Sequence, residues 1–293
     1  MGSDRLHYKR RQAEKFTSVG RVARQRYDAA SASAHESRNM PLVVFNQKGG
    51  VGKSTIACNL AAISAAQGRR TLLIDLDVQG NSSRYLLGAQ PATQAGGVAG
   101  FFEQTLSYTF NPLPPTHFVQ RTPFDGLDLL AASPTLDELQ PKLEARHKIY
   151  KLREALAQLG REYQQIYLDT PPALNFYTRS ALMGASGCLI PFDCDDFSRQ
   201  ALYTLLANVE EIRADHNAAL QVKGIVVNQF QPRARLPQQL VQELIDEGLP
   251  VLQPYLQASV KVRESHQLAR PLIHLEPKHP LTQALLALHQ RLL

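Results

Sequence analysis

A glycine-rich segment with two lysines occupies residues 46–55 and reads Asn-Gln-Lys-Gly-Gly-Val-Gly-Lys-Ser-Thr. It follows an apolar run at 42–45 and precedes a helical pattern at 54–67. A strand that passes through a glycine turn into a helix can cradle phosphate, because backbone N–H groups and the helix dipole both favour negative charge. The predicted nucleotide-binding residues are Gly49, Gly50, Val51, Gly52, Lys53, Ser54 and Thr55.

Lys53 is expected to reach the β- and γ-phosphates, and the Ser54 hydroxyl is expected to ligate Mg²⁺. The common form of this loop has a glycine five residues before Gly52, where this chain has Gln47 followed by a second lysine, Lys48. Six fixed residue types arise by chance in a chain of this size with odds of roughly 10⁻⁵. The pattern therefore predicts a nucleotide site and not a simple connecting turn.

The Lys-Gly-Gly-Val-Gly-Lys-Ser sequence of residues 48–54 resembles the deviant Walker A motif of the ParA/MinD family of P-loop ATPases. The resemblance implies an ATPase with ATP and Mg²⁺ as cofactors. It also implies that Lys48 crosses the interface of an ATP-bound homodimer and acts on the phosphates of the second subunit.

Two carboxylates leave the apolar run at 71–75, namely Asp75 at its end and Asp77 two residues later. In an open α/β sheet, ligands bind beyond the carboxyl ends of the strands, so we expect both side chains to face the phosphate loop. The segment resembles the family's Asp-x-Asp-Pro-Gln-Gly-Asn motif, with Val78 in place of proline. By this resemblance, Asp77 positions the attacking water and Asp75 lies near Mg²⁺. Capping of a following helix is the alternative role for a pair of acids.

Further polar residues end three later runs. Asp169 ends the run at 165–169 and precedes Thr-Pro-Pro, which is the Walker B arrangement that holds Mg²⁺. Asn228 follows the run at 223–227, and its amide could pair with the edge of adenine or form a turn. An acidic loop after 188–192 is either a solvated helix start or, by the resemblance, a site of dimer and nucleotide contacts; it contains Asp193, Asp195 and Asp196.

From Pro41 onward, apolar runs alternate with helical patterns, which predicts an α/β fold: a doubly wound, mostly parallel sheet with helices on both faces. The expected strands are 42–45, 71–75, 127–131, 165–169, 188–192 and 223–227, with an edge strand within 250–256. The expected helices are 54–67, 148–159, 175–183, 198–213, 236–247, 259–269 and 280–292, with short ones at 82–87 and 101–106. Gly68 and Gly160 are predicted to cap the helices that precede them.

Positive charge is concentrated at the N-terminus. The 293 residues carry a formal charge of +6, and residues 1–40 alone contain nine Lys/Arg and four Asp/Glu, a net of +5. We therefore divide the chain into a basic arm, 1–40, and a P-loop ATPase domain, 41–293. The arm, with a short helix predicted over 8–27, would touch nucleic acid or a partner, or it is a solvated tail.

Composition narrows the class of protein. The chain is 44% hydrophobic and 20% charged, which is ordinary for a globular protein. No apolar stretch approaches the ~18 residues needed to span a bilayer. We see no signal-peptide core, so the sequence predicts a cytoplasmic protein without a membrane partner. Cys58 and Cys188 lie in apolar runs and are predicted to be core residues, and no cysteine or histidine spacing suggests a metal site.

The resemblance is closest to ParA-type partition ATPases. It implies ATP-dependent dimerisation and nonspecific binding of duplex DNA by a protein that is nucleoid-associated when ATP-bound. Hydrolysis stimulated by a ParB-like or adaptor protein would reset it, so that plasmid or chromosomal DNA is segregated. Candidate DNA-contacting residues are Arg199, Arg233, Arg235, Lys261, Arg263 and Arg270.

Other functions remain as alternatives. A ParA-like ATPase that positions a protein cargo would have the same motifs. A MinD-like membrane switch would need a basic amphipathic C-terminus, whereas 280–293 contains only Arg291 and His289. An electron-transfer relative would need cysteines at the dimer interface, and a metabolic enzyme of this fold would not need Lys48.

Overall fold

The computed structural model describes residues 41–88, 96–194 and 198–293; the helix predicted over 8–27 lies outside them. The strands are β1 (Leu42–Val44), β2 (Thr71–Asp75), β3 (Gln120–Arg121), β4 (Leu127–Leu130), β5 (Gln165–Asp169), β6 (Gly187–Asp193), β7 (Gln221–Asn228) and β8 (Val251–Leu252). The helices are α2 (Lys53–Ala66), α3 (Asn81–Leu87), α4 (Gly97–Leu106), η2 (Pro115–Phe118), α5 (Leu136–Ala145), α6 (Lys151–Leu159), α7 (Phe176–Gly184), α8 (Ser198–Asp215), α9 (Arg235–Asp246), α10 (Val260–Gln267), α11 (Leu272–Leu275) and α12 (Pro280–Leu292).

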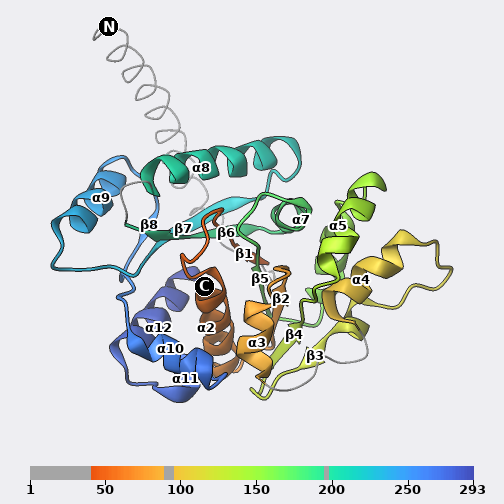
Figure 1. Ribbon diagram of the computed structural model, residues 1–293, viewed down its shortest axis with the longest axis horizontal. Helices are drawn as coiled ribbons and strands as arrows, with labels where there is room; N and C mark the ends of the chain where they lie inside the picture. The colour runs from red at the N-terminus through yellow and green to blue at the C-terminus, as the bar shows by residue number, and fades with distance from the viewer. Residues whose placement is uncertain (1–40, 89–95, 195–197) are drawn as a thin grey trace, which may run out of the picture.

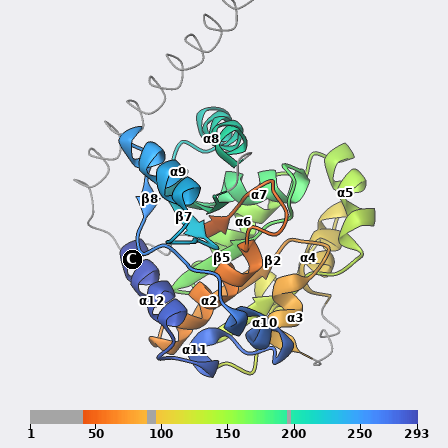
Figure 2. The same ribbon diagram turned by 60° about the vertical axis from the view of Figure 1, so that its left-hand side comes forward.

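The strands form one eight-stranded sheet in the order β3-β4-β2-β5-β1-β6-β7-β8. Every neighbouring pair is parallel except β3 with β4. Helices cover both faces of this sheet (Figures 1 and 2). The predicted α/β, doubly wound and mostly parallel fold is therefore confirmed.

Each strand and helix predicted within the described residues is present within a few residues, but four elements were not predicted: β3, η2, α5 and α11. Helix α5 contains Pro141 and a mostly polar sequence, which obscured it. Gly68 has a left-handed φ of 83° just after α2, in keeping with its predicted capping role. Gly160 also ends its helix, but with a right-handed φ of −63°.

The two faces of the sheet bury separate cores. Along β1 and the residue after it, Val43 and Phe45 face one core, while Leu42 and Val44 face the other, as the two-residue period of a strand requires. Helices α4 to α9 cover the first core, which we call the aromatic face. Helices α2, α3, α11 and α12 cover the second, with α10 beside them, and we call this the nucleotide face.

Side chains predicted to lie in the core are buried there. Cys58 is buried on the nucleotide face and Cys188 on the aromatic face. Leu281, Leu285 and Leu288 of α12 pack against the second core, so this amphipathic helix serves the packing role predicted for it. In the described part of the chain, none of the helices combines the length and the apolar character needed to cross a bilayer.

Candidate nucleotide site

The phosphate loop emerges at the centre of the sheet. Strand β1 lies between β5 and β6: its last residue, Val44, pairs with Asp169 at the end of β5 and with Leu189 of β6, which continues to Asp193 beside the loop. Figure 1 shows this loop leading directly into α2 beneath the sheet. The fold therefore brings together polar residues that are more than 100 positions apart in the sequence.

Gly52 is the residue on which the loop geometry depends most. It is the N-cap of α2 with a left-handed φ of 91°, which favours glycine. A Cβ at this position would lie 2.3 Å from Asn228 Nδ2, so a side chain would also collide with β7. No side chain caps the start of α2 and no acid lies in its first turn, which leaves its backbone N–H groups for an anion.

Lys53 lies inside the loop. Its side chain is buried, and Nζ donates to the Lys48 carbonyl oxygen at 3.0 Å. Burial lowers its pKa, and the negative charges of Asp169 and Asp77 counter part of that effect. An ammonium held under the loop among carboxylates fits the predicted role of contacting phosphates.

Asp169 has the geometry that best suits a cation ligand. Oδ2 accepts a hydrogen bond from Ser82 Oγ at 2.7 Å, whereas the buried Oδ1 has no hydrogen-bond partner among the described residues. Burial raises its pKa to about 6, and the hydroxyls of Ser54 and Ser82 and the charge of Lys53 oppose this rise. Buried polar atoms are rarely left unpaired in native proteins, so this oxygen fits the inner or outer coordination sphere of Mg²⁺.

The Asp75 carboxylate accepts hydrogen bonds from the first turn of α3. Its Oδ2 accepts hydrogen bonds from both N and Oγ of Ser83, each at 2.7 Å, and Oδ1 accepts from Asp77 N at 3.2 Å. Burial and then the neighbouring Asp169 charge raise its pKa to about 7, and these hydrogen bonds oppose the rise. The geometry thus shows the capping role that was the alternative for this acid, directly beside the site predicted to hold Mg²⁺.

Asp77 is buried at the start of the turn between β2 and α3. Its Oδ1 accepts from Gln79 N at 3.0 Å, which fixes the carboxylate, and its charge acts on Lys53. Asp77 is therefore within electrostatic reach of the phosphate loop, as the sequence predicted.

Lys48 extends to the rim of the loop. Its Nζ lies 2.6 Å from Asp193 Oδ2, with 36% of the side chain exposed. Its backbone N donates to Asn46 Oδ1, and Asn46 Nδ2 donates to the Pro191 carbonyl oxygen at 2.7 Å. The sequence reasoning missed Asn46, which ties the mouth of the loop to β6. Of the three acids predicted here, Asp195 and Asp196 lie outside the described residues.

The end of β7 holds the other side of the loop. Asn228 Nδ2 donates to the Val51 carbonyl oxygen at 2.9 Å, and Gln229 Nε2 donates to the Gly50 carbonyl oxygen at 3.1 Å. The Asn228 amide donor, predicted to meet adenine, is therefore engaged with the phosphate loop in this structure. Gln229 was not predicted to belong to the site.

Sequence comparisons agree with this geometry. A family model described as an AAA domain, AAA_31, matches residues 40–222. The chain is 31% identical to the chromosome partitioning protein ParA of Myxococcus xanthus, covering 86% of this chain and 87% of that protein. It is 34% identical to the chromosome-partitioning ATPase Soj of Thermus thermophilus, covering 82% and 89%. The chain belongs to the ParA/MinD family of P-loop ATPases.

The family assignment makes this protein an ATPase that uses ATP and Mg²⁺. A similar solved structure is that of cobyrinic acid a,c-diamide synthase from Mycobacterium smegmatis with a bound ATP analogue and magnesium. It is 25% identical, with a TM-score of 0.73, and the match covers 86% of this chain and 93% of that one. The residues present here fit these cofactors, because within the described part of the chain no side chain caps the start of α2 and Asp169 Oδ1 has no hydrogen-bond partner.

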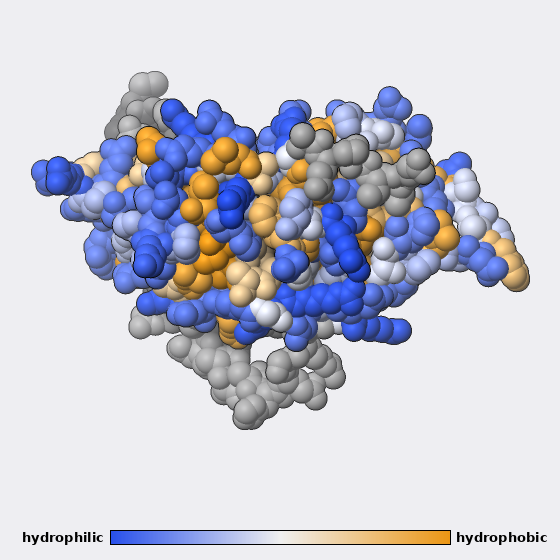
Figure 3. Space-filling view, turned by 90° about the horizontal axis from the view of Figure 1, so that it is seen from below, coloured by the Kyte–Doolittle hydropathy of each residue, from blue (hydrophilic) through white to orange (hydrophobic). Residues whose placement is uncertain are grey.

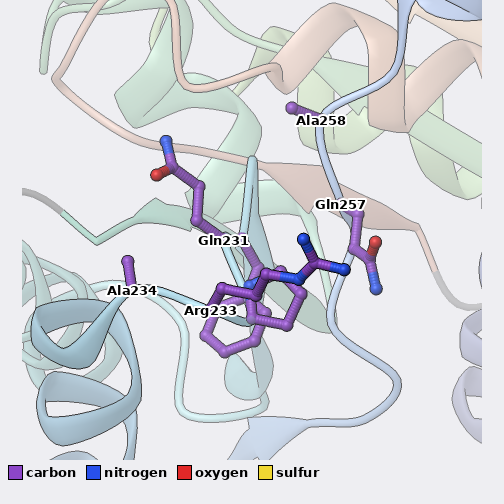
Figure 4. Close-up of a pocket in the computed structure, with 7 residues that line it drawn as sticks. Gln231, Arg233, Ala234, Gln257 and Ala258 are labelled. Carbon is purple, nitrogen blue, oxygen red and sulfur yellow. The ribbon is translucent and has the colours of Figure 1, made fainter.

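An open hollow of about 640 Å³ lies just beyond the residues of β7 that contact the loop. It is lined by Phe230, Gln231, Pro232, Arg233, Ala234, Gln257 and Ala258. Figure 4 shows Arg233, on the segment after β7, extending toward Gln257 on the segment after β8, whereas the Gln231 side chain points away from Gln257. Phe230 joins the two segments through its backbone N, which donates to the Leu256 carbonyl oxygen at 2.9 Å.

The candidate DNA-contacting residues of this ATPase fall into two groups. Arg199 is paired with Glu243 and Glu247 of the α9 region, and Lys261 is paired with Glu264 and Glu276. These two cations brace neighbouring elements. The exposed members of the set are Arg233, Arg235, Arg263 and Arg270. The face on which α10 to α12 lie is largely hydrophilic, with apolar areas between (Figure 3).

Proposed function

We propose that this ATPase is a partition-type switch. ATP binding closes a homodimer, the dimer binds duplex DNA nonspecifically, and a ParB-like or adaptor protein resets it by stimulating hydrolysis. The relatives named for chromosome partitioning, at 31% and 34% identity over most of the chain, support this function. The cargo would then be plasmid or chromosomal DNA.

The observation that carries the proposal is that the two lysines of the loop lie in different positions. Lys53 Nζ points under the loop toward the Lys48 carbonyl oxygen, whereas Lys48 Nζ lies at the rim beside Asp193 and remains partly exposed. One subunit therefore has its own phosphate-binding lysine inside the site. A second lysine at the rim is suited to reach the phosphates of a facing subunit, which would make ATP part of the dimer interface.

Within one subunit, the residues of the site mainly position the phosphates and neutralise their charge, and they form no covalent bond, as phosphoryl transfer requires. Lys53 holds the β- and γ-phosphates, and the backbone of Gly49 to Gly52 binds their oxygens. Ser54 and Asp169 would hold Mg²⁺, which supplies neutralisation of the charge between the phosphates when bound. Asp75 holds the start of α3 and thereby fixes the turn that carries Asp77.

Asp77 is the residue that we expect to orient the attacking water. Its carboxylate is fixed by Gln79 N and lies near Lys53. Asp77→Ala should therefore keep ATP binding and dimer formation but lower the turnover rate at least about 10²-fold, as loss of a positioned acid–base group does. Phosphate release measures the turnover rate, and light scattering measures dimer formation with ATP. Normal turnover in this variant would remove Asp77 from the role.

The hollow beyond β7 is suited to the adenine base. Phe230 and Pro232 offer apolar surface, and Gln231 and Gln257 offer amide groups at its edge. Ala258→Trp would fill the hollow, so we expect it to weaken ATP binding about tenfold or more, through steric exclusion of the base. Competition by tripolyphosphate, which has no base, should be unchanged. Equal weakening of both ligands would mean that the hollow does not hold the base.

Retention on duplex DNA tests the whole switch. The retention of purified protein on the DNA is measured with ATP, with ADP and without nucleotide, each at 50 and 200 mM salt. A site with ~6 phosphate contacts loses about 10³ in affinity between these salt concentrations. We expect retention that requires ATP and falls with salt. Lys48→Ala should bind ATP yet stay monomeric and unretained. Retention that ignores the nucleotide would contradict the proposal.

Two arginines provide a matched pair for the same assay. Arg263→Ala should weaken retention, because this side chain is exposed on α10. Arg199→Ala should leave retention unchanged, because Arg199 is engaged with Glu243 and Glu247. A reversed result would move the DNA-binding surface from α10 to the α8–α9 side.

A further inference from the structure

A buried polar cluster lies behind the phosphate loop, where α2, α3, α10 and α11 meet. Its side chains are Thr55 and Asn59 of α2, Tyr85 of α3, and Ser265 and His266 of α10. Asn59 and Ser265 are fully buried and Tyr85 is almost so. The cluster therefore joins the first turn of the phosphate-loop helix to a segment of the chain more than 200 residues away.

His266 makes two contacts in this cluster that are directional. Its Nε2 lies 2.9 Å from Thr55 Oγ1. Its ring stacks on Tyr85, with 3.9 Å between ring centroids and 15° between ring planes. Tyr85 is itself fixed, because its hydroxyl bonds Ser265 Oγ and accepts from Asn59 Nδ2 at 3.2 Å. The imidazole thus has one defined orientation, with Nε2 aimed at α2.

Thr55 is held from a second side as well. Asn59 Nδ2 donates to the Thr55 carbonyl oxygen at 2.8 Å, and Asn59 Oδ1 accepts from Leu272 N at the start of α11, also at 2.8 Å. The carbonyl of Thr55 is therefore fixed by Asn59 and its hydroxyl by His266. Thr55 lies two residues after Lys53, in the first turn of the helix whose N-terminus faces the nucleotide.

A hydroxyl group has one hydrogen to donate and two lone pairs to accept with. If Nε2–H donates to Thr55 Oγ1, the hydroxyl hydrogen of Thr55 is left for a phosphate oxygen. If Nε2 accepted instead, that hydrogen would be used on the histidine. Burial lowers the pKa of His266, so the ring is neutral near pH 7 and has a single N–H.

We propose that His266 is a positioning residue of the nucleotide site, which donates from Nε2 to Thr55 Oγ1 and so directs the Thr55 hydroxyl hydrogen to a phosphate of the bound nucleotide. This inference rests on the proposed function of the phosphate loop. It assigns a role in nucleotide affinity to a residue of α10, an element that no nucleotide motif in the sequence includes.

Three substitutions separate the hydrogen bond from the packing. His266→Phe keeps a ring to stack on Tyr85 but cannot donate to Thr55. Thr55→Val keeps the shape of threonine but has no hydroxyl. His266→Gln has no ring but keeps an amide donor at a similar reach. Each variant is titrated with a fluorescent ATP analogue in Mg²⁺, and its urea unfolding midpoint is measured without nucleotide.

His266→Phe should weaken analogue binding about fivefold, the effect of losing one neutral hydrogen bond. Thr55→Val should weaken it by at least as much, and the double variant should bind no more weakly than Thr55→Val alone, because both changes remove the same interaction. His266→Gln should bind within about twofold of the wild type, since it keeps the donor. The ¹⁵N NMR shifts of the His266 ring should report hydrogen on Nε2 in the wild type.

Several outcomes would overturn the inference. These are wild-type affinity in His266→Phe, additive losses in the double variant, a loss in His266→Gln equal to that in His266→Phe, or hydrogen on Nδ1. If His266→Phe fails to fold, the other variants and the NMR measurement still decide. A wild-type protein that binds no ATP would instead refute the proposed function, so the two failures are distinguishable.

Discussion

The two faces of the sheet differ in the side chains that fill their cores. On the aromatic face, the buried core includes a large group of aromatic side chains: Phe45, Phe101, Phe102, Phe118, Tyr163, Phe176, Tyr177 and Phe192. On the nucleotide face, the aromatic residues of the buried core, within the described chain, are Tyr85 and Tyr167. Buried hydrogen bonds tie elements together there, such as Thr71 Oγ1 to Ser64 Oγ at 2.9 Å.

This difference suits the work of each face. Apolar packing is non-directional and tolerates exchange among side chains of similar volume. Hydrogen bonds fix distances and angles between particular atoms. The helices that present phosphate-binding groups are thus held in part by contacts that define position. Hydrogen bonds also join helices on the aromatic face, such as Tyr177 Oη to the Leu136 carbonyl oxygen at 2.6 Å, but aromatic packing supplies much of the burial there. Substitutions on the two faces should therefore separate nucleotide affinity from stability.

The largest effect expected on the nucleotide face is loss of binding in Lys53→Ala. Its ammonium lies under the loop beside Asp169 and Asp77, where it would make charge-assisted hydrogen bonds to two phosphates. Removing these should weaken ATP binding by roughly a thousandfold. In thermal unfolding, Mg-ATP should raise the midpoint of the wild type but not that of the variant.

Lys48→Ala is the matched control for this experiment, because Lys48 lies at the rim and not under the loop. Its unfolding midpoint should still rise with Mg-ATP. Strong ATP binding by Lys53→Ala would contradict the site described here.

The converse effect is expected for Phe102→Ala on the aromatic face. Phe102 is fully buried in α4 and contacts Phe101, Phe176 and Tyr177 at ring-centroid distances of 5.0, 5.8 and 5.5 Å. Truncation should lower the free energy of unfolding by about 3–5 kcal/mol, as large cavities do, with unchanged ATP affinity in the folded fraction. Phe102→Leu, which leaves a smaller cavity, should cost less. A loss of ATP affinity in Phe102→Leu would mean that the faces are coupled.

The sequence predicts the aromatic face better than it predicts the polar contacts. Apolar runs and their spacing are local signals, so the strands and most helices were located within a few residues. The phosphate loop and the acids at 75, 77 and 169 were found for a related reason, since each lies at the end of a strand or within a few residues beyond it. Helix α5 escaped detection although Leu136, Leu139 and Leu143 keep a helical spacing, because Pro141 inside it argues against a helix.

The partners of these residues could not be predicted, because they are distant in the chain. Ser82 has no motif, yet its hydroxyl binds Asp169, which is 87 residues away. Arg199 was predicted as a candidate DNA contact, and only the fold brings Glu243 and Glu247 to it. His266 lies 211 residues from Thr55. Long-range hydrogen bonds depend on the tertiary arrangement, which spacing does not encode.

The smallest effect expected is a pH-dependent change in the free energy of unfolding. It comes from a buried side chain of the nucleotide face that is not hydrogen-bonded like the others there. His289 of α12 is fully buried, and neither ring nitrogen has a hydrogen-bond partner among the described residues. Burial, with the charge of Arg69, lowers its pKa to about 4. The nucleotide face therefore contains a buried titratable group that no hydrogen bond among the described residues satisfies.

The direction of the pH dependence follows from the two states. The unfolded chain, with a histidine pKa of about 6.5, binds a proton more readily than the folded protein does between about pH 6.5 and 4. The free energy of unfolding should therefore fall as the pH drops through this range, by about 3 kcal/mol at most.

In His289→Leu this contribution is absent. The free energy of unfolding of the variant minus that of the wild type should therefore increase from pH 7.5 to 4.5. Urea titrations at these pH values measure this difference, in which the effects of carboxylates common to both proteins cancel. His117→Gln, at an exposed position, should show no such change. A pH-independent difference for His289→Leu would mean that His289 is hydrogen-bonded or solvated, and that the nucleotide face has no such exception.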